Sequence, residues 1–71
     1  MSKADEMFEK LGYGKYEDLR KIHYIDKDTQ RIILNKDTKK FYKEGHDYVD
    51  YISMQELQAI NEKCLELGWI E

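Results

Sequence analysis

The clearest alternation of hydrophobic and polar residues runs from Ile52 to Ile70. Hydrophobic residues recur there at steps of three and four positions, which is the spacing of one face of an α-helix. The residues on this face are Met54, Leu57, Ile60, Cys64 and Leu67. Polar residues occupy the opposite face, namely Gln55, Glu56, Lys63 and Glu66. The pattern predicts a C-terminal helix whose hydrophobic face packs against another layer of the protein.

Both ends of this predicted helix carry recognisable signals. Ser53, followed three positions later by Glu56, is a capping box, in which each side chain accepts a hydrogen bond from the backbone N–H of the other residue. Gly68 supplies the end, because glycine adopts a positive φ without a clash at Cβ. We expect Trp69 to fold back over the last turn.

A shorter helix is predicted from Ser2 to Leu11, and Gly12 ends it. Its hydrophobic face consists of Ala4, Met7, Phe8 and Leu11. Residues 13–18 follow as a predicted connection that belongs to neither a helix nor a strand. We expect the two tyrosines of this connection, Tyr13 and Tyr16, to cover the edge of the core.

The middle of the chain has the period of β-strands rather than helices. Alternating or continuous hydrophobic residues predict strands at Arg20–Asp26, Gln30–Asn35 and Lys40–Lys43. A further strand at Tyr48–Ile52 rests on a weaker pattern. Short turns separate these segments, and their Asp, Asn, Thr and Gly residues are typical of tight turns.

These elements predict one α+β domain over residues 1–71. It contains a short N-terminal helix, an antiparallel meander of three or four strands, and a C-terminal helix packed with the first helix on one face of the sheet. The strands are antiparallel because the connections between them are short. A helix this size buries too little surface to be stable alone, so the sheet must cover its hydrophobic face.

Charge and cysteine content narrow the class of protein. The chain has a net charge of −3, but residues 20–44 carry eight bases against four acids, between two acidic ends. A single cysteine excludes an internal disulfide and favours a reducing compartment. The N-terminus lacks the hydrophobic segment of a signal peptide, and no stretch is long enough to span a membrane. We expect a soluble, cytoplasmic protein without membrane contact.

The cysteine and the histidines, which are common catalytic and metal-binding residues, are more simply interpreted as structural residues here. Cys64 lies on the hydrophobic face of the predicted helix, where it packs as a small apolar residue. His23 lies in a predicted strand and His46 in a predicted turn, and their spacing with Cys64 matches no known metal site. No phosphate loop, catalytic triad motif or dinucleotide fingerprint is present. The sequence therefore predicts a protein that is not an enzyme and needs no cofactor.

Basic and aromatic residues are interleaved along the predicted meander. Cations for phosphates and rings for bases are what a surface for single-stranded nucleic acid needs. The candidate residues for this function are Arg31, Lys39, Lys40, Tyr42 and Lys43. The alternative is that lysines at turns and strand edges only prevent pairing with other chains, and the neighbouring acids favour that alternative.

Six tyrosines in 71 residues suit a protein interface, because tyrosine combines a large apolar ring with a polar hydroxyl. They equally suit a small domain whose core is never far from water. Tyr48 and Tyr51 precede an acidic helix, and Trp69 follows it. We predict that these three residues contact a protein partner.

The two predicted helices resemble those of small phage and prophage proteins of Gram-positive bacteria. The residues that carry the resemblance are Met7-Phe8, Leu11-Gly12-Tyr13, Ser53, Glu56, Leu57, Ala59, Ile60 and Glu66-Leu67-Gly68-Trp69. It implies a phage-borne accessory protein in the cytoplasm of a bacterial host. Because these motifs are caps and core positions, the resemblance implies no activity and no functional residues.

The leading hypothesis is therefore a non-enzymatic accessory protein that binds another protein or a second copy of itself. Binding of single-stranded nucleic acid to the outer face of the sheet ranks second.

Overall fold

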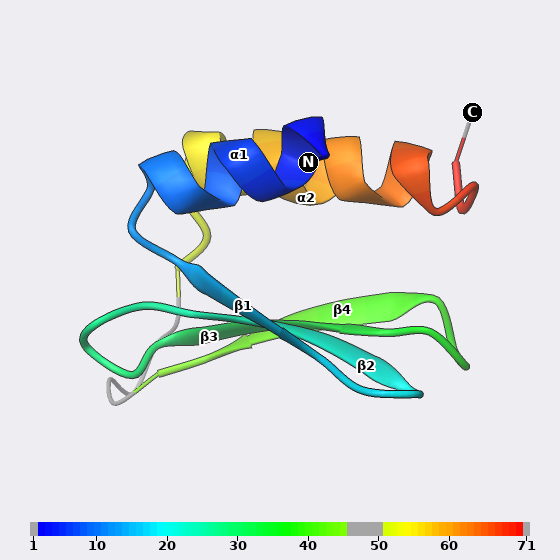
Figure 1. Ribbon diagram of the computed structural model, residues 1–71, viewed down its shortest axis with the longest axis horizontal. Coiled ribbons are helices and arrows are strands. Elements are labelled where there is room, and N and C mark those ends of the chain that lie inside the picture. Colours follow the sequence, from blue (N-terminus) through cyan, green and yellow to red (C-terminus); the bar gives the residue numbers. More distant parts are fainter. Residues whose placement is uncertain (1, 46–50, 71) are drawn as a thin grey trace.

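The computed structural model describes residues 2–45 and 51–70. The elements in chain order are α1 (Lys3–Lys10), β1 (Gly14–Glu17), β2 (Lys21–Ile25), β3 (Arg31–Asn35), β4 (Lys40–Glu44) and α2 (Met54–Glu66). The strands form one antiparallel sheet in the order β1-β2-β3-β4. Both helices lie side by side on one face of this sheet (Figure 1). The predicted α+β architecture is confirmed.

The two helices begin and end as the sequence predicts. Ser2 caps α1, and Ser53 forms the full capping box with Glu56 at α2. Gly12 and Gly68 follow the helices with φ of 95° and 75°, respectively. At each end, two N–H groups donate back to the last turn: those of Gly12 and Tyr13 after α1, and those of Gly68 and Trp69 after α2. The same C-terminal motif therefore ends both helices.

The turns between the strands are held by side chains of the predicted turn residues. The Asp26 carboxylate accepts from the backbone N–H of Asp28 and Gln30, each at 2.9 Å. The Asn35 side chain accepts from the N–H of Asp37 at 2.9 Å and of Thr38 at 3.1 Å. These bonds satisfy backbone groups that the strands leave free, and they fix where each hairpin turns.

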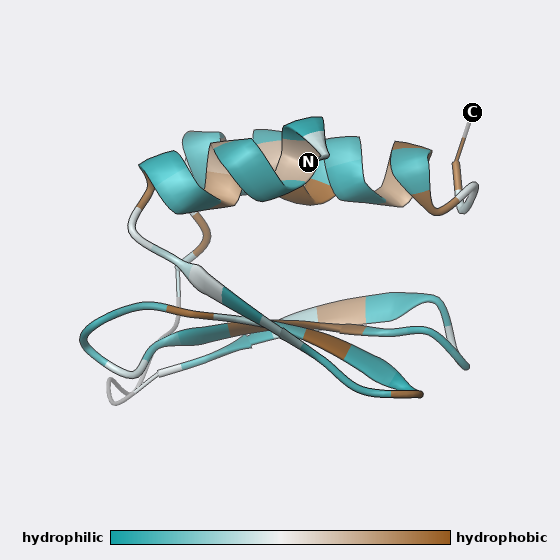
Figure 2. Ribbon diagram, viewed as in Figure 1, coloured by the Kyte–Doolittle hydropathy of each residue, from teal (hydrophilic) through white to brown (hydrophobic). Residues whose placement is uncertain are grey.

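The hydrophobic core lies between the helices and the sheet. Its largest fully buried side chains are Phe8, Ile22, Tyr24, Ile32, Leu34 and Ile60. The rings of Phe8 and Tyr24 stack with centroids 3.7 Å apart and planes 11° from parallel. Figure 2 shows hydrophobic bands alternating with hydrophilic ones along both helices, as expected for elements with one buried side.

One prediction about strands needs correction, and another falls mostly outside the described residues. The segment predicted as a connection contains β1, an edge strand in which all four residues are exposed. Its four residues do not alternate between buried hydrophobic and exposed polar positions, so the sequence pattern does not indicate a strand. Tyr13 covers the core as expected, but Tyr16 does not. Residues 48–50 of the other predicted strand lie outside the described residues, and residues 51 and 52 belong to no strand.

The predicted buried face of α2 is also partly wrong. Ile60 and Cys64 are buried as expected, but Met54 and Leu57 are exposed. Glu56 and Lys63, predicted to face solvent, are buried instead. Compared with the predicted orientation, the helix is rotated about its axis, because Glu56 and Lys63 bind partners on the sheet and on α1. Those partners define the clusters described next.

Candidate functional site

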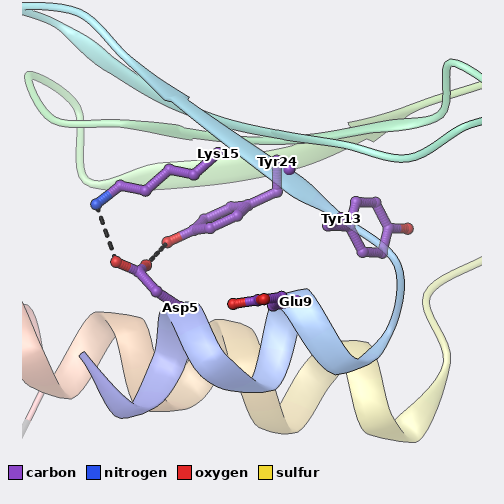
Figure 3. A pocket seen from close by; sticks show the side chains of 6 residues that line it. Asp5, Glu9, Tyr13, Lys15 and Tyr24 are labelled. Carbon is purple, nitrogen blue, oxygen red and sulfur yellow. Dashed lines mark hydrogen bonds and ion pairs between the residues drawn. The ribbon is translucent and has the colours of Figure 1, made fainter. Parts of the chain in front are cut away.

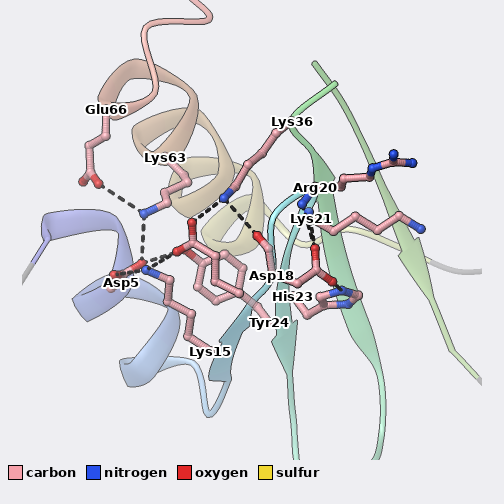
Figure 4. Close-up of polar contacts among 11 residues, drawn as sticks. Asp5, Lys15, Asp18, Arg20, Lys21, His23, Tyr24, Lys36, Lys63 and Glu66 are labelled. Atoms are coloured by element: carbon pink, nitrogen blue, oxygen red, sulfur yellow. Dashed lines mark hydrogen bonds and ion pairs between the residues drawn. The ribbon is translucent and has the colours of Figure 1, made fainter. Parts of the chain in front are cut away.

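A cluster of charged and phenolic groups ties α1 to α2 and to the sheet, and Asp5 is at its centre. Tyr24 donates to the Asp5 carboxylate at 2.6 Å and Lys15 at 3.0 Å. From α2, the Lys63 ammonium lies 3.3 Å from Asp5 and 3.6 Å from Glu66. Figure 4 shows these side chains converging from both helices and both of the first two strands. We call these five residues the Asp5 cluster.

The surroundings keep the Asp5 cluster in one charge state. Burial alone would raise the pKa of Asp5, but hydrogen bonds from Tyr24 and Lys15 hold it well below its ordinary value of 3.8. Burial and the Asp5 carboxylate raise the pKa of Tyr24 above its ordinary value of 10.0. Near neutral pH, Asp5 is therefore ionised and Tyr24 protonated. Fixed charges of this kind hold elements together rather than exchange protons with a substrate.

A second cluster joins the start of α2 to β4 and to the end of α1. Tyr13 donates to the Glu56 carboxylate, which also accepts from the Ser53 backbone at 2.8 Å. The Lys43 ammonium lies 3.2 Å from both Glu56 oxygens and 2.7 Å from the Tyr51 carbonyl. Burial alone would raise the pKa of Glu56, but these donors lower it. The capping residue is therefore also a buried ion-pair partner.

An open pocket of about 420 Å³ lies beside the Asp5 cluster, between α1 and β1. Its lining includes Asp5, Glu9, Tyr13, Lys15 and Tyr24, and Figure 3 shows Tyr24 and Lys15 both reaching Asp5 across it. Because Asp5 already binds three donors, its oxygens are occupied by the protein itself. The carboxylate that lines this pocket is therefore part of the cluster that joins the layers.

The thiol and the imidazole lie apart. Cys64 is buried in the core, and burial raises the pKa of its thiol. His23 lies on the face of the sheet away from the helices, and His46 lies outside the described residues. Within residues 2–45 and 51–70, no group of three or more His, Cys, Asp or Glu side chains is placed to hold a metal ion. No helix in this part of the chain is long and apolar enough to cross a membrane.

The face of the sheet turned away from the helices, here called the open face, carries a row of large side chains. The strand register places Tyr16, His23, Ile33 and Tyr42 side by side across all four strands. The Tyr16 and His23 rings lie 5.5 Å apart. Ile33 is only 3% exposed in this row, although it is not part of the cluster of buried residues between the helices and the sheet. Tyr16 and Tyr42 are 61% and 41% exposed, so the two ends of this central row face solvent.

A second row of polar residues runs parallel to the central row. Lys21, Asn35 and Lys40 are register partners on β2, β3 and β4. Beside them, Asp18 accepts from the backbone N–H of Arg20 and Lys21, and the carboxylate lies 3.6 Å from the His23 imidazole (Figure 4). These backbone hydrogen bonds lower the pKa of Asp18. A shallow pocket of about 560 Å³ includes this turn and its almost fully exposed Leu19.

The structure separates the residues predicted to bind nucleic acid. Arg31, Lys40 and Tyr42 lie on the open face, and Lys39 lies in the turn before β4 with φ of 58°. Lys43 lies on the helix side, in the Glu56 ion pair. The expectation that Lys43 belongs to a basic outer face is therefore wrong.

The residues predicted to bind protein are also apart. Tyr51 precedes α2 and is highly exposed, whereas Trp69 follows α2 and packs partly against the core. The thirteen residues of α2 separate them by about 20 Å. Tyr48 lies outside the described residues. Tyr51 and Trp69 therefore do not form one patch.

The sequence does not predict the central row, because its pattern places Tyr16 in a connection and not in a strand. The signal that could have identified the row is a further hairpin before Arg20. Such a hairpin would pair residues 14–17 with β2 and place Tyr16 opposite His23. Comparison of the chain with models of protein families, with curated proteins and with solved structures finds no match in any of the three.

Proposed function

We propose that this protein is a non-enzymatic binding protein that recognises another protein through the open face of its sheet. The observation that carries the proposal is the central row. Tyr16 and Tyr42 expose rings at its ends, and the buried Ile33 and half-buried His23 fill its middle. Tyrosine is enriched in the energetically dominant parts of protein interfaces because its ring and hydroxyl can both be used. Both helices of the described chain lie on the other face (Figure 1).

The composition of the row favours a protein partner over nucleic acid. A platform for bases needs several exposed rings close together, but the two exposed tyrosines lie on opposite edge strands. An aliphatic side chain lies between them. Acidic residues, Asp18 and Glu44, accompany the cations at this surface and would repel phosphates. A mixed row with a charged border is typical of protein interfaces.

Single-stranded nucleic acid is the second candidate, and the polar row supports it. In the polar row, Lys21 and Lys40 lie on either side of Asn35. Each residue of this row is two positions along its strand from a residue of the central row. Two residues of a strand span about 6.5 Å, so phosphates could follow the lysines while bases contact the tyrosines.

The biological setting is also part of the proposal. We infer a phage-borne accessory role in the cytoplasm of a bacterial host, because the helix motifs resemble those of small phage and prophage proteins. Those motifs occupy the caps and the core here. The open face, and not these motifs, would then determine which partner is bound.

Photocrosslinking tests the protein-binding proposal directly. A photoreactive phenylalanine analogue replaces Tyr16 in one preparation and Tyr51 in a matched control, and each is exposed to nuclease-treated host lysate. Both positions are exposed, but only Tyr16 lies on the open face. We expect a discrete protein adduct from position 16 and none of the same mass from position 51. Equal adducts from both positions, or none from position 16, would contradict the proposal.

Oligonucleotide binding separates the second candidate from the first. A labelled single strand is titrated with the native chain at low and moderate salt, and with Tyr16→Ser and Lys21→Glu. Nucleic-acid binding on the open face predicts salt-sensitive affinity that falls about tenfold in each variant. Protein binding predicts no saturable oligonucleotide complex with any of the three chains.

A further inference from the structure

Part of α2 is hydrophobic but faces solvent to a large extent. Met54, Leu57 and Leu65 are 68%, 43% and 41% exposed. At 100° per residue, these three side chains fall within an arc of about 80° on one side of the helix. We call them the α2 stripe. An isolated exposed leucine needs no explanation, but a stripe along a helix is typical of a contact surface.

The α2 stripe lies above the outer edge of β4. The opposite side of α2 contacts α1, since Glu66 accepts from the Ala4 N–H at 2.9 Å and Lys63 pairs with Asp5. In the sheet, α1 lies by β1 and β2, whereas Glu56 of α2 pairs with Lys43 of β4. The side of α2 away from α1 therefore faces the β4 edge. Phe41, on the helix side of β4, is 40% exposed there.

β4 is an edge strand whose sequence is complementary to itself. It pairs with β3 and with no other described strand. When two copies run antiparallel about Tyr42, each Lys40 lies opposite Glu44 of the other copy, and each Phe41 lies opposite the aliphatic part of Lys43. Tyr42 lies opposite its own copy.

The other edge of the sheet is closed to such pairing. β1 has only four residues, and its two charged side chains point to the helix side. Lys15 is held by Asp5 at 3.0 Å, and Glu17 by Lys36 at 2.5 Å. Short strands with inward-pointing charges are the usual protection of a sheet edge, and β1 has two such charges in four residues where β4 has one, Lys43, in five. The α2 stripe also lies at the far side of the molecule from β1.

We propose that two copies of this chain associate through antiparallel β4 edges, with the α2 stripes meeting across the two-fold axis. The strand edge supplies backbone hydrogen bonds and the two Lys40–Glu44 pairs, and the helices supply the hydrophobic contact. The result is a continuous sheet of eight strands, four from each copy. The central rows of the two copies meet where the two Tyr42 side chains lie opposite each other. This association uses Lys40 and Tyr42 at the β4 end of the open face, but it leaves Tyr16, His23 and Lys21 uncovered for a partner there.

Sedimentation equilibrium of the full chain, from about 1 μM to about 1 mM, measures the association. The native chain is expected to show a monomer–dimer equilibrium within this range. Leu57→Asp places a charge in the helix contact, and Lys40→Glu replaces both attractive pairs with repulsive ones, so each weakens the dimer about tenfold or more. Lys21→Glu is the matched control, because it makes the same charge change on β2 and leaves the equilibrium unchanged.

Charge exchange tests the register. Glu44→Lys alone weakens the dimer, but an equimolar mixture of Lys40→Glu and Glu44→Lys chains associates, because every pair is again of opposite sign. The double variant, Lys40→Glu with Glu44→Lys, also regains the native affinity. Circular dichroism checks that each variant is folded. A native chain that stays monomeric at about 1 mM overturns the proposal, as does a dimer that Lys40→Glu leaves intact or the mixture does not restore. Capture of an unrelated protein by the edge of a monomeric chain would equally overturn it.

Discussion

The two faces of the sheet use the same residue type in opposite ways. On the helix side, Tyr24 is 1% exposed, stacks on Phe8 and donates its hydroxyl to Asp5. On the open face, Tyr16 and Tyr42 extend from the edge strands into solvent. Tyr24 and Tyr16 lie on neighbouring strands of the sheet, yet the first holds the layers together and the ring of the second faces solvent.

The difference separates the tyrosines that hold this fold together from those that are exposed on its surface. Tyr13 and Tyr24 each have a carboxylate partner from a helix, and burial with these partners raises the pKa of both. A tyrosine whose hydroxyl is bound across layers is part of the fold. The exposed tyrosines of the central row are not needed for it, so substitutions there should affect binding and not stability.

The largest expected effect is at Tyr24. Tyr24→Ala removes the ring that stacks on Phe8 and leaves Asp5 without its shortest donor, so we expect a loss of about 3–5 kcal/mol in the free energy of unfolding. Tyr42→Ala on the open face should cost less than about 1 kcal/mol. Urea denaturation followed by circular dichroism compares the two variants. Equal losses would contradict the distinction between the two faces.

The next effect is at Asp5. Asp5→Asn removes the charge that faces Lys15 and Lys63, and we expect a loss of about 2 kcal/mol at neutral pH. The exposed Glu9 of the same helix provides the control, since Glu9→Gln should leave stability nearly unchanged.

The same variant has a predicted pH dependence. Because folding lowers the pKa of Asp5, its contribution is complete above the ordinary value of 3.8 and is lost as the pH falls from there toward the lower pKa of the folded state. The native chain should therefore lose stability on acidification more steeply than Asp5→Asn does. Urea midpoints measured at several pH values test this, and identical slopes would show that Asp5 is not held as described.

A smaller effect is expected at Tyr13. Tyr13→Phe keeps the ring against Phe8 but removes the donor to Glu56, which retains Lys43 and the Ser53 N–H. We expect a loss of about 1 kcal/mol. The corresponding change on the open face, Tyr16→Phe, should alter stability by less than about 0.5 kcal/mol. Thermal unfolding of both variants tests whether a carboxylate partner for the hydroxyl makes a tyrosine important for stability.

The sequence predicted those parts of the fold that depend on local chemistry. The capping box at Ser53, the turn residues Asp26 and Asn35, and the two terminal glycines act within a few positions of themselves. Their effect can therefore be read without knowing the tertiary structure. The alternation of Ile22 and Tyr24 likewise identified one strand and its buried side.

The sequence could not predict contacts between elements far apart in the chain. Lys63 is buried because Asp5, 58 positions away, lies beside it. Glu56 is buried because it accepts from Tyr13 and Lys43. The assumption that charged residues face solvent assigns Glu56 and Lys63 to the wrong side of α2. The same assumption predicts that Leu57 is buried, although it is exposed. The central row was missed for a related reason, since it exists only in the register of four strands.

Measuring one variant in two ways tests most directly whether the open face binds a partner without holding the fold. Tyr16→Ser is assayed for its free energy of unfolding in urea and for the amount of partner it retains from lysate, with Tyr51→Ser as the control. We expect that Tyr16→Ser unfolds like the native chain but retains about a tenth or less of the partner, while Tyr51→Ser retains all of it. Full retention by Tyr16→Ser, or a loss of partner that merely follows unfolding, would contradict this expectation.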